Sequence, residues 1–354
     1  MEKMKAVVLR GEGEYGVELV DIPQPGYGEA LVKIQAVAIC GSDPRIFAGG
    51  SRSNGWPPHY PFIAGHEFAG EVVAVGEGVI KFQPGDRVAG EAHCGCGICE
   101  MCAKGQYNLC FNYRREGSRH RHYGHYSPGC YAQYQVYDAK ALTALPDGVS
   151  YEEGALVDTG GIALNALRLC GVESGSYTVI IGPGPMGLMA MQLAKTMGSV
   201  TIVIGRGRRL ELAGELGADH LINFEETPDV VAAVRALTNG LGADQVIEAA
   251  GSAGVFVQAI LLARKGGHVA FISIPATEEQ EVAVKTLIMN QITLHGVRAN
   301  PNCSATVLKL MAQGKLDSRA TITHTFGIDQ VKEAFDTFIG RKDGAVKVLI
   351  YPWK

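Results

Sequence analysis

The first part of the chain alternates short apolar runs with turn signals. Between residues 5 and 149 the runs are brief and rich in valine and alanine, and segments such as QPGYGE (24–29) and FQPGDR (82–87) separate them. Short apolar runs bounded by glycine and proline are typical of strands. We therefore expect an irregular, strand-rich domain, with strands at residues 5–9, 30–39, 70–79, 86–90 and 131–138.

Beyond residue 150 the rhythm changes to strand and helix in alternation. Apolar strands are expected at residues 178–182, 200–205, 220–224, 244–251 and 268–274. Helices are expected between them at residues 186–198, 208–217, 229–240 and 256–267. Parallel strands need crossover connections, so this alternation indicates βαβ units around a parallel sheet. The fold class predicted is α/β, with a β-rich domain followed by a doubly wound sheet.

The C-terminal part returns to a mixed pattern. It carries two amphipathic helices, at 305–316 and 328–340, and a last strand at 346–351, which we expect to pack back on the first domain. A chain of 354 residues exceeds what a single hydrophobic core normally supports, at about 250–300 residues. The boundaries predicted are a first domain made of residues 1–150 and 300–354, and a second made of residues 151–299.

Composition and charge exclude several classes of partner. Apolar residues make up 47% of the chain, and the formal net charge is −4. A protein that binds nucleic acid or membranes usually carries a basic surplus, so we expect neither partner. The N-terminus lacks the apolar core of a signal peptide, and no run is long enough to cross a bilayer. We expect a cytoplasmic protein whose partners are small molecules and copies of itself.

The segment GPGPMG (182–187) is a candidate dinucleotide-binding turn. It follows an apolar strand and opens a helix, which is the context that makes a G-x-G-x-x-G match informative. The glycines allow a tight turn and close approach of a pyrophosphate to the helix N-terminus. The alternative is a glycine-rich turn without a ligand. The expected cofactor-binding residues here are Gly182, Gly184, Pro185, Met186 and Gly187.

The end of the second strand bears on the choice between NAD and NADP. An NAD enzyme usually places an acid there, but this chain has Gly205 and Arg206, with Arg208 and Arg209 close behind. Arginine pairs with a 2′-phosphate that a carboxylate would repel, so Arg206 favours NADP over NAD. The alternative is a solvated arginine cluster at the start of a helix.

Nine cysteines are present, and four of them are spaced like metal ligands. Cys96, Cys99, Cys102 and Cys110 form the pattern C-x2-C-x2-C-x7-C. Four thiolates fill a tetrahedral zinc site and leave no position for substrate, so this set predicts a structural zinc. Cys94 is a rival ligand. The alternative, four unliganded core cysteines, fits a glycine-rich loop poorly.

A catalytic metal needs ligands that leave one position open. Candidates are Cys40, His66, Glu67 and Asp158, but no local motif joins them. Taken alone, a single cysteine is more often a small buried residue, and a single histidine is more often a core residue with its hydrogen bonds satisfied. Spacing alone leaves this second site open.

Several segments together resemble the zinc-dependent medium-chain dehydrogenase/reductase superfamily. They are CGSD (40–43), IAGHEFAGEVVAVGEGVIKFQPGDRV (63–88), the four-cysteine loop, EEGALVD (152–158) and GPGPMG. Together with ALNALR (163–168), they are most similar to the sorbitol, threonine, butanediol and bacterial secondary-alcohol dehydrogenase branches. The resemblance implies a GroES-like catalytic domain formed by both chain ends, a Rossmann domain between them, and a homodimer or homotetramer.

The resemblance also assigns roles to residues. It implies a catalytic zinc on Cys40, His66 and Asp158, with Glu67 beside the metal. Ser42 matches the hydroxyl that hydrogen-bonds the zinc-bound oxygen, and Arg45 stands where many relatives have a histidine. One catalytic and one structural zinc per chain, with NAD or NADP, are therefore expected.

The function predicted is the interconversion of a secondary alcohol and its ketone by hydride transfer, with a polyol, sugar derivative or diol as substrate. An alternative within the same superfamily is an anionic or otherwise polar substrate, because the loop 112–129 carries four arginines and three histidines. An alternative from another class is a non-enzymatic zinc protein that binds a partner. The acidic charge balance speaks against nucleic acid as that partner.

Overall fold

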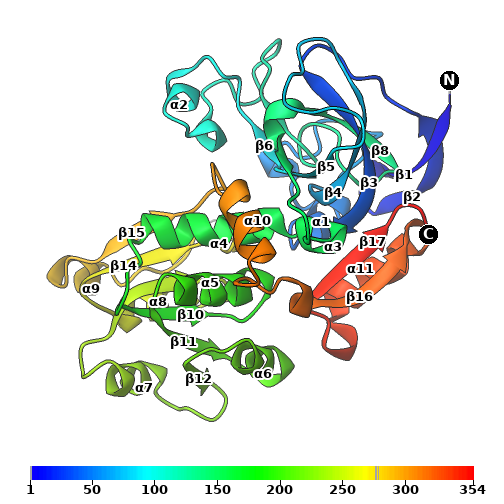
Figure 1. The fold of residues 1–354 in the computed structure, drawn as a ribbon. Helices are drawn as coiled ribbons and strands as arrows, with labels where there is room; N and C mark the ends of the chain where they lie inside the picture. Colours follow the sequence, from blue (N-terminus) through cyan, green and yellow to red (C-terminus); the bar gives the residue numbers. More distant parts are fainter. Residues whose placement is uncertain (1, 276, 278) are drawn as a thin grey trace. The chain divides into compact units, whose positions relative to one another are not determined.

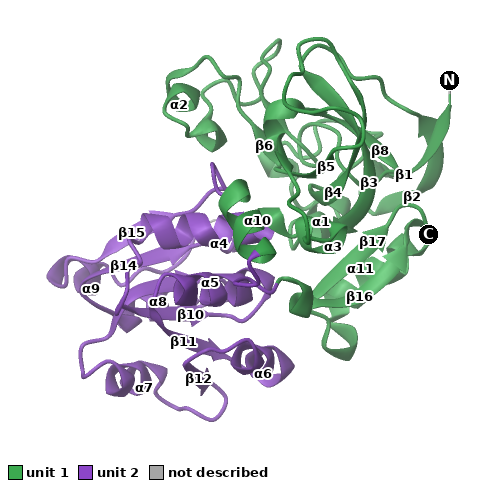
Figure 2. Ribbon diagram, viewed as in Figure 1, with its two compact units in different colours: residues 1–158, 304–312, 318–354 green, residues 159–303, 313–317 purple. Residues whose placement is uncertain are grey.

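The structure is a computed structural model that describes residues 2–275, 277 and 279–354. The chain divides into two compact units, which Figure 2 colours separately. Unit 1 comprises Met1–Asp158, Ser304–Ala312 and Ser318–Lys354, and unit 2 comprises Thr159–Cys303 and Gln313–Asp317. The first boundary lies later than the predicted residue 150, because the buried segment that leads to Asp158 stays with unit 1.

Unit 1 is built around a sheet that, in the described part of the chain, has seven strands. The order is β16-β17-β3-β4-β5-β9, and β8 pairs with β3 (Figure 1). The bounds are β3 Glu29–Ala38, β4 Glu67–Val75, β5 Arg87–Gly90, β8 Tyr134–Asp138, β9 Leu142–Ala144, β16 Ile322–Gly327 and β17 Lys347–Tyr351. Because β17 pairs with β3, the C-terminal strand completes the sheet of the first unit.

Short elements surround this sheet. Two further strand pairs are β1 (Lys3–Gly11) with β2 (Glu14–Asp21), and β6 (His93–Cys94) with β7 (Arg121–His122). The helices are α1 Asp43–Phe47, α2 Glu100–Ala103, α3 Tyr151–Gly154, α10 Ser304–Ala312 and α11 Val331–Gly340. The 3-10 turns are η1 Arg52–Asn54, η2 Tyr107–Leu109, η3 Ala139–Ala141, η4 Arg319–Thr321, η5 Ile328–Gln330 and η6 Lys342–Gly344.

Unit 2 contains a parallel sheet, and its strand order confirms the predicted doubly wound class. In the described residues the order is β12-β11-β10-β13-β14-β15, which is the 3-2-1-4-5-6 order of a Rossmann fold. The strands are β10 Tyr177–Ile181, β11 Val200–Gly205, β12 His220–Asn223, β13 Ala243–Glu248, β14 Ala263–Phe271 and β15 Thr293–Gly296. The helices are α4 Val157–Leu169, α5 Pro185–Thr196, α6 Gly207–Glu215, α7 Val230–Leu237, α8 Val255–Leu262 and α9 Val284–Met289.

Burial explains why the apolar runs form these strands. Val179, Ile202, Val246 and Val269 are fully buried in the core of unit 2. Strands covered on both faces have continuous apolar runs, which is the pattern seen in the sequence.

The described helices include none that is long and apolar enough to cross a membrane.

One predicted helix is wrong at its end. A helix was expected over residues 256–267, but α8 ends at Leu262 and β14 begins at Ala263. Gly266 has a φ of +69°, a conformation that interrupts a helix, and a Cβ on Gly267 would lie 2.9 Å from the carbonyl oxygen of Arg264. The glycine pair therefore lies inside the strand, three residues after its start, rather than at the end of the helix.

Candidate active site and metal centres

Sheet register brings the first candidate ligands together. β3 and β4 are antiparallel neighbours, and Ala38 pairs with Glu67. Cys40 follows the end of β3 and His66 immediately precedes β4. Because the two strands are antiparallel, both residues lie at the same end of this strand pair. Ligand atoms of Cys40, His66 and Glu67 lie within 4.8 Å of one another.

Asp158 lies near this group without joining it. It is 3% exposed, and it stands in the first turn of α4. The group within 4.8 Å contains Glu67 in its place. Burial raises the pKa of Asp158 to about 6, and the charge of His66 partly opposes the shift. Its Oδ1 is buried and accepts no hydrogen bond from the described residues.

The electrostatics of the group favour a bound cation. Burial alone lowers the pKa of the His66 imidazole, but its acidic neighbours raise it to about 10. These neighbours are Cys40, Asp43 and Asp158. The acidic groups around the imidazole therefore favour a positive charge at this point of unit 1. The donor set of one sulfur, one nitrogen and carboxylate oxygen therefore fits a zinc ion.

Asp43 is a positioning residue that sequence reasoning did not identify. Its fully buried Oδ2 accepts hydrogen bonds from the Cys40 backbone N–H (2.8 Å) and the Tyr131 hydroxyl (2.7 Å). Its Oδ1 lies 3.6 Å from Nδ1 of His66. At this distance the two atoms make no hydrogen bond, and Asp43 acts on the imidazole through its charge. The signal was present in the sequence as the last residue of CGSD.

Lys347 was also missed, and nothing local in the sequence points to it. Its Nζ lies 2.5 Å from Oε2 of Glu67, and both side chains are buried. The register of β17 on β3 and of β3 on β4 links these two distant residues through one sheet. Lys347 therefore holds the carboxylate of Glu67 and offsets part of the negative charge at the site.

Ser42 and Arg45 have different environments. Oγ of Ser42 is buried and makes no hydrogen bond to the described part of the chain. Arg45 is exposed in the last turn of α1.

The loop 112–129 contributes stacked imidazoles to unit 1. His122 stacks on His125 at a centroid distance of 4.1 Å, and on His93 at 4.0 Å. His125 in turn lies 4.5 Å from the ring of His66. We call the rings of His125, His122 and His93 the histidine column. It brings this loop into contact with a candidate metal ligand.

The arginines of the same loop are engaged elsewhere. Nη2 of Arg119 donates to the Tyr27 carbonyl (3.0 Å) and to Oδ2 of Asp138 (3.3 Å). Nη1 of Arg121 donates to the carbonyls of Ser118 and His120. These contacts hold the loop in place, which supports a structural role for both guanidinium groups rather than the binding of an anionic substrate.

The four spaced cysteines converge in the loop that holds α2. Their sulfur atoms lie within 4.8 Å of one another, with 3.9 Å between Cys96 and Cys102 and 3.8 Å between Cys99 and Cys110. Zinc–sulfur bonds of about 2.3 Å place thiolates about 3.8 Å apart in a tetrahedron. Burial opposes ionisation, yet hydrogen bonds from Ile98 and Asn112 lower the pKa of Cys96 to about 6.

Cys94, the rival ligand, lies in the hydrophobic core of unit 1. Burial raises the pKa of its thiol to about 12. It does not belong to the sulfur cluster found among the described residues. The cluster therefore consists of the four cysteines at the predicted spacing.

The GPGPMG segment forms a tight turn between β10 and α5. Gly182 has a φ of +92°, and a Cβ there would lie 2.9 Å from the Cβ of Ala250. A Cβ on Gly187 would lie 2.1 Å from the carbonyl oxygen of Gly182, so the helix packs directly on the turn. Gly184 caps α5, Pro185 is its first residue and Met186 follows. Both the turn and the helix N-terminus fit a pyrophosphate.

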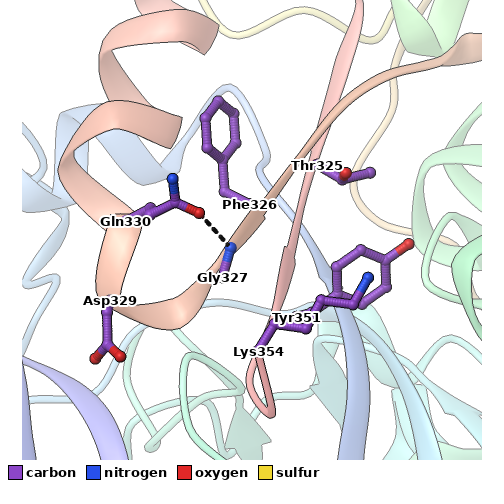
Figure 3. A pocket seen from close by; sticks show the side chains of 7 residues that line it. All are labelled: Thr325, Phe326, Gly327, Asp329, Gln330, Tyr351 and Lys354. Atoms are coloured by element: carbon purple, nitrogen blue, oxygen red, sulfur yellow. Dashed lines mark hydrogen bonds between the residues drawn. The ribbon is translucent and has the colours of Figure 1, made fainter.

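Figure 3 shows a surface pocket of unit 1. Its lining residues are Thr325, Phe326, Gly327, Asp329, Gln330, Tyr351 and Lys354. The side chain of Gln330 accepts a hydrogen bond from the Gly327 backbone N–H (3.1 Å). The lining shares no residue with the Cys40, His66 and Glu67 group.

Comparisons with known proteins agree with this geometry. The Alcohol dehydrogenase GroES-like domain matches residues 26–147, and the Zinc-binding dehydrogenase model matches residues 185–313. A sorbitol dehydrogenase from Bacillus subtilis is 33% identical over 99% of this chain and 98% of its own length.

Two solved structures share the fold. A zinc-binding dehydrogenase from Sinorhizobium meliloti, solved with NADP, has 30% identity and a TM-score of 0.89, and the match covers 99% of this chain and all of that one. An alcohol dehydrogenase from Escherichia coli, solved with NADH, has 28% identity and a TM-score of 0.88 with the same coverage. The chain belongs to the zinc-dependent medium-chain dehydrogenase/reductase superfamily and is a nicotinamide-dependent dehydrogenase.

Proposed function

We propose that this enzyme interconverts a secondary alcohol and its ketone at a zinc ion held by Cys40 and His66, with Asp158 or Glu67 as the third ligand. The observation that carries the proposal is the convergence of Cys40, His66 and Glu67 within 4.8 Å in a buried, negatively charged environment. When bound, zinc polarises a hydroxyl or carbonyl oxygen, and the nicotinamide carries the hydride.

The residues of the chain prepare this chemistry. Asp43 holds the backbone of Cys40 and places a carboxyl group beside the ring of His66, and Lys347 holds Glu67. Oγ of Ser42 is proposed to accept the proton of the substrate hydroxyl within a hydrogen bond and to pass it toward solvent. The turn at Gly182–Gly187 and the N-terminus of α5 bind the cofactor pyrophosphate.

The second metal is proposed to be structural. Four thiolates complete a tetrahedral shell, so the Cys96, Cys99, Cys102 and Cys110 site has no position for a substrate. This site is proposed to hold the loop around α2 in shape, and it gives a total of two zinc ions per chain.

For the substrate, we propose a polyol, sugar derivative or diol. Support comes from the sorbitol dehydrogenase of Bacillus subtilis, which matches nearly the whole chain. The test is an assay of polyols, diols, sugars and simple monoalcohols with NAD and NADP in parallel, read by nicotinamide absorbance. Turnover of polyols or diols is expected to exceed that of primary monoalcohols; turnover of primary alcohols alone would contradict the proposal.

We also propose that the enzyme prefers NADP, works in the cytoplasm and forms a homodimer or homotetramer. Arg206 at the end of β11 supports the cofactor preference. Exposed apolar side chains on α9, including Ile288 at 67% and Met289 at 73%, support an assembly of identical chains. Light scattering on the purified enzyme tests the assembly, and a monomer would contradict it.

A further inference from the structure

The end of β11 has no room for the acid that usually binds the cofactor ribose. β11 ends at Gly205, and a Cβ added there would lie 2.5 Å from Cδ and Cγ of Pro183. Pro183 belongs to the glycine turn, so the turn itself fills the space of a side chain at position 205. Recognition of the ribose must therefore come from a different residue.

The residues that follow the neighbouring strand place a carboxylate beside the carboxyl end of β11. β12 runs parallel to β11, and Asn223 pairs with Gly205. The Phe224 backbone N–H donates to the Gly205 carbonyl (3.3 Å), and Oδ1 of Asn223 accepts from the Glu225 backbone N–H (3.1 Å). These bonds hold Glu225 beside the carboxyl end of β11.

Glu225 is paired with Arg206. Nη1 of Arg206 lies 2.5 Å from Oε1 of Glu225, and the guanidinium lies over the ring of Phe224 at 5.6 Å. The two charged side chains are 57% and 52% exposed. An exposed ion pair contributes little, so an incoming ligand can exchange either partner without a large penalty.

The other two arginines of this segment have different neighbours. Arg208 pairs with Glu215 and Glu211 on its own helix, α6. Nη1 of Arg209 is the nearest atom to a Cβ built on Gly184, at 3.9 Å. Arg209 thus lies toward the pyrophosphate turn, and Arg206 lies toward the carboxylate of Glu225.

We propose that the Arg206–Glu225 pair selects the cofactor at the 2′ position of the adenosine ribose. With NADP, the 2′-phosphate takes the place of the Glu225 carboxylate on Arg206, because phosphate and guanidinium pair strongly. With NAD, the Glu225 carboxylate accepts a hydrogen bond from the 2′-hydroxyl. Glu225 therefore moderates the NADP preference that Arg206 alone would confer. The inference rests on the nicotinamide cofactor of the proposed function and adds the residue that limits its selectivity.

The experiment measures binding of NAD and NADP to the full-length protein by calorimetry. Glu225→Gln removes a charge that competes with the phosphate, so the ratio Kd(NAD)/Kd(NADP) is expected to rise about tenfold. Arg206→Gln is expected to lower the same ratio about tenfold, mainly through weaker NADP binding. Arg208→Gln is the matched control, an exposed arginine paired on its own helix, and its ratio is expected to equal that of the wild type.

The outcomes separate this inference from the proposed function. If Glu225→Gln keeps the wild-type ratio, the inference is wrong, whether or not Arg206→Gln changes the ratio. If the ratios change as expected while the enzyme oxidises no secondary alcohol, the proposed substrate class is wrong and the inference about the Arg206–Glu225 pair holds. A wild-type protein that binds neither NAD nor NADP would contradict both the proposed function and the inference about the Arg206–Glu225 pair. Circular dichroism of each variant confirms that the fold is intact before binding is compared.

Discussion

The ring of His125 lies 4.5 Å from the ring of His66, at an angle of 47°. His122 stacks on His125 at 4.1 Å and 6°, and Trp56 meets His125 edge-on at 4.8 Å. His66 therefore contacts the ring of His125, and its Nδ1 lies 3.6 Å from Oδ1 of Asp43. This packing restricts the orientations available to the imidazole of a proposed zinc ligand.

Removal of the ring at position 125 is expected to loosen the metal. His125→Ala leaves a void beside His66, and changes around a metal ligand typically cost 10–100-fold in affinity, so we expect about tenfold faster zinc loss to a chelator. His125→Phe retains a flat ring and is expected to stay closer to the wild type. Equal zinc loss from all three proteins would contradict a positioning role for this ring.

Glu91 is expected to make stability depend on pH. Burial raises the pKa of Glu91 to about 7, although hydrogen bonds from Ser304 and Tyr107 lower it in part. The folded state thus binds a proton more tightly than the unfolded state, so stability falls as pH rises from about 4.5 to about 7. The loss is on the order of 2–3 kcal/mol.

The measurement is urea unfolding at pH 5 and pH 8. Glu91→Gln carries no titrating proton, so its unfolding free energy is expected to change less than that of the wild type over this interval. A wild-type protein whose stability is the same at both values, or rises, would show that the Glu91 carboxyl is not perturbed in this way.

Loss of one thiolate from the sulfur cluster is expected mainly to lower the thermal stability of the protein. Cys99→Ser removes a zinc ligand, and a cost of about 3 kcal/mol would lower Tm by roughly 6–12 °C. Metal analysis should show one zinc per chain instead of two. Cys170→Ala, a buried cysteine of unit 2 outside the cluster, is expected to keep both metals. An unchanged zinc content in Cys99→Ser would argue against the structural site.

Local patterns predicted most of unit 2 because its strands are buried on both faces. The run at residues 200–205 coincides with β11, whereas β15 and β16 were not predicted. β15 lies at the edge of its sheet, and Thr293 and Gly296 are exposed, so it lacks the apolar run that revealed the inner strands. The end of α8 was misplaced because the glycine pair at 266–267 is typical of a helix end, whereas in the structure it lies inside β14.

The site was less accessible to sequence reasoning than the fold. The cysteine cluster has a local spacing, and its sulfur atoms meet in the structure. Cys40 and His66 have no such spacing, and resemblance to a known family was needed to join them. Lys347 and Glu225 were missed because sheet register, rather than sequence proximity, brings them to Glu67 and Arg206.

The most direct test of the central claim is the zinc content and alcohol oxidation of Cys40→Ser beside the wild type. We expect two zinc ions per chain and oxidation of a secondary alcohol in the wild type. Cys40→Ser is expected to retain one zinc, a native circular dichroism spectrum and no turnover. If Cys40→Ser keeps both zinc ions and its full rate, the metal centre at Cys40 and His66 is refuted.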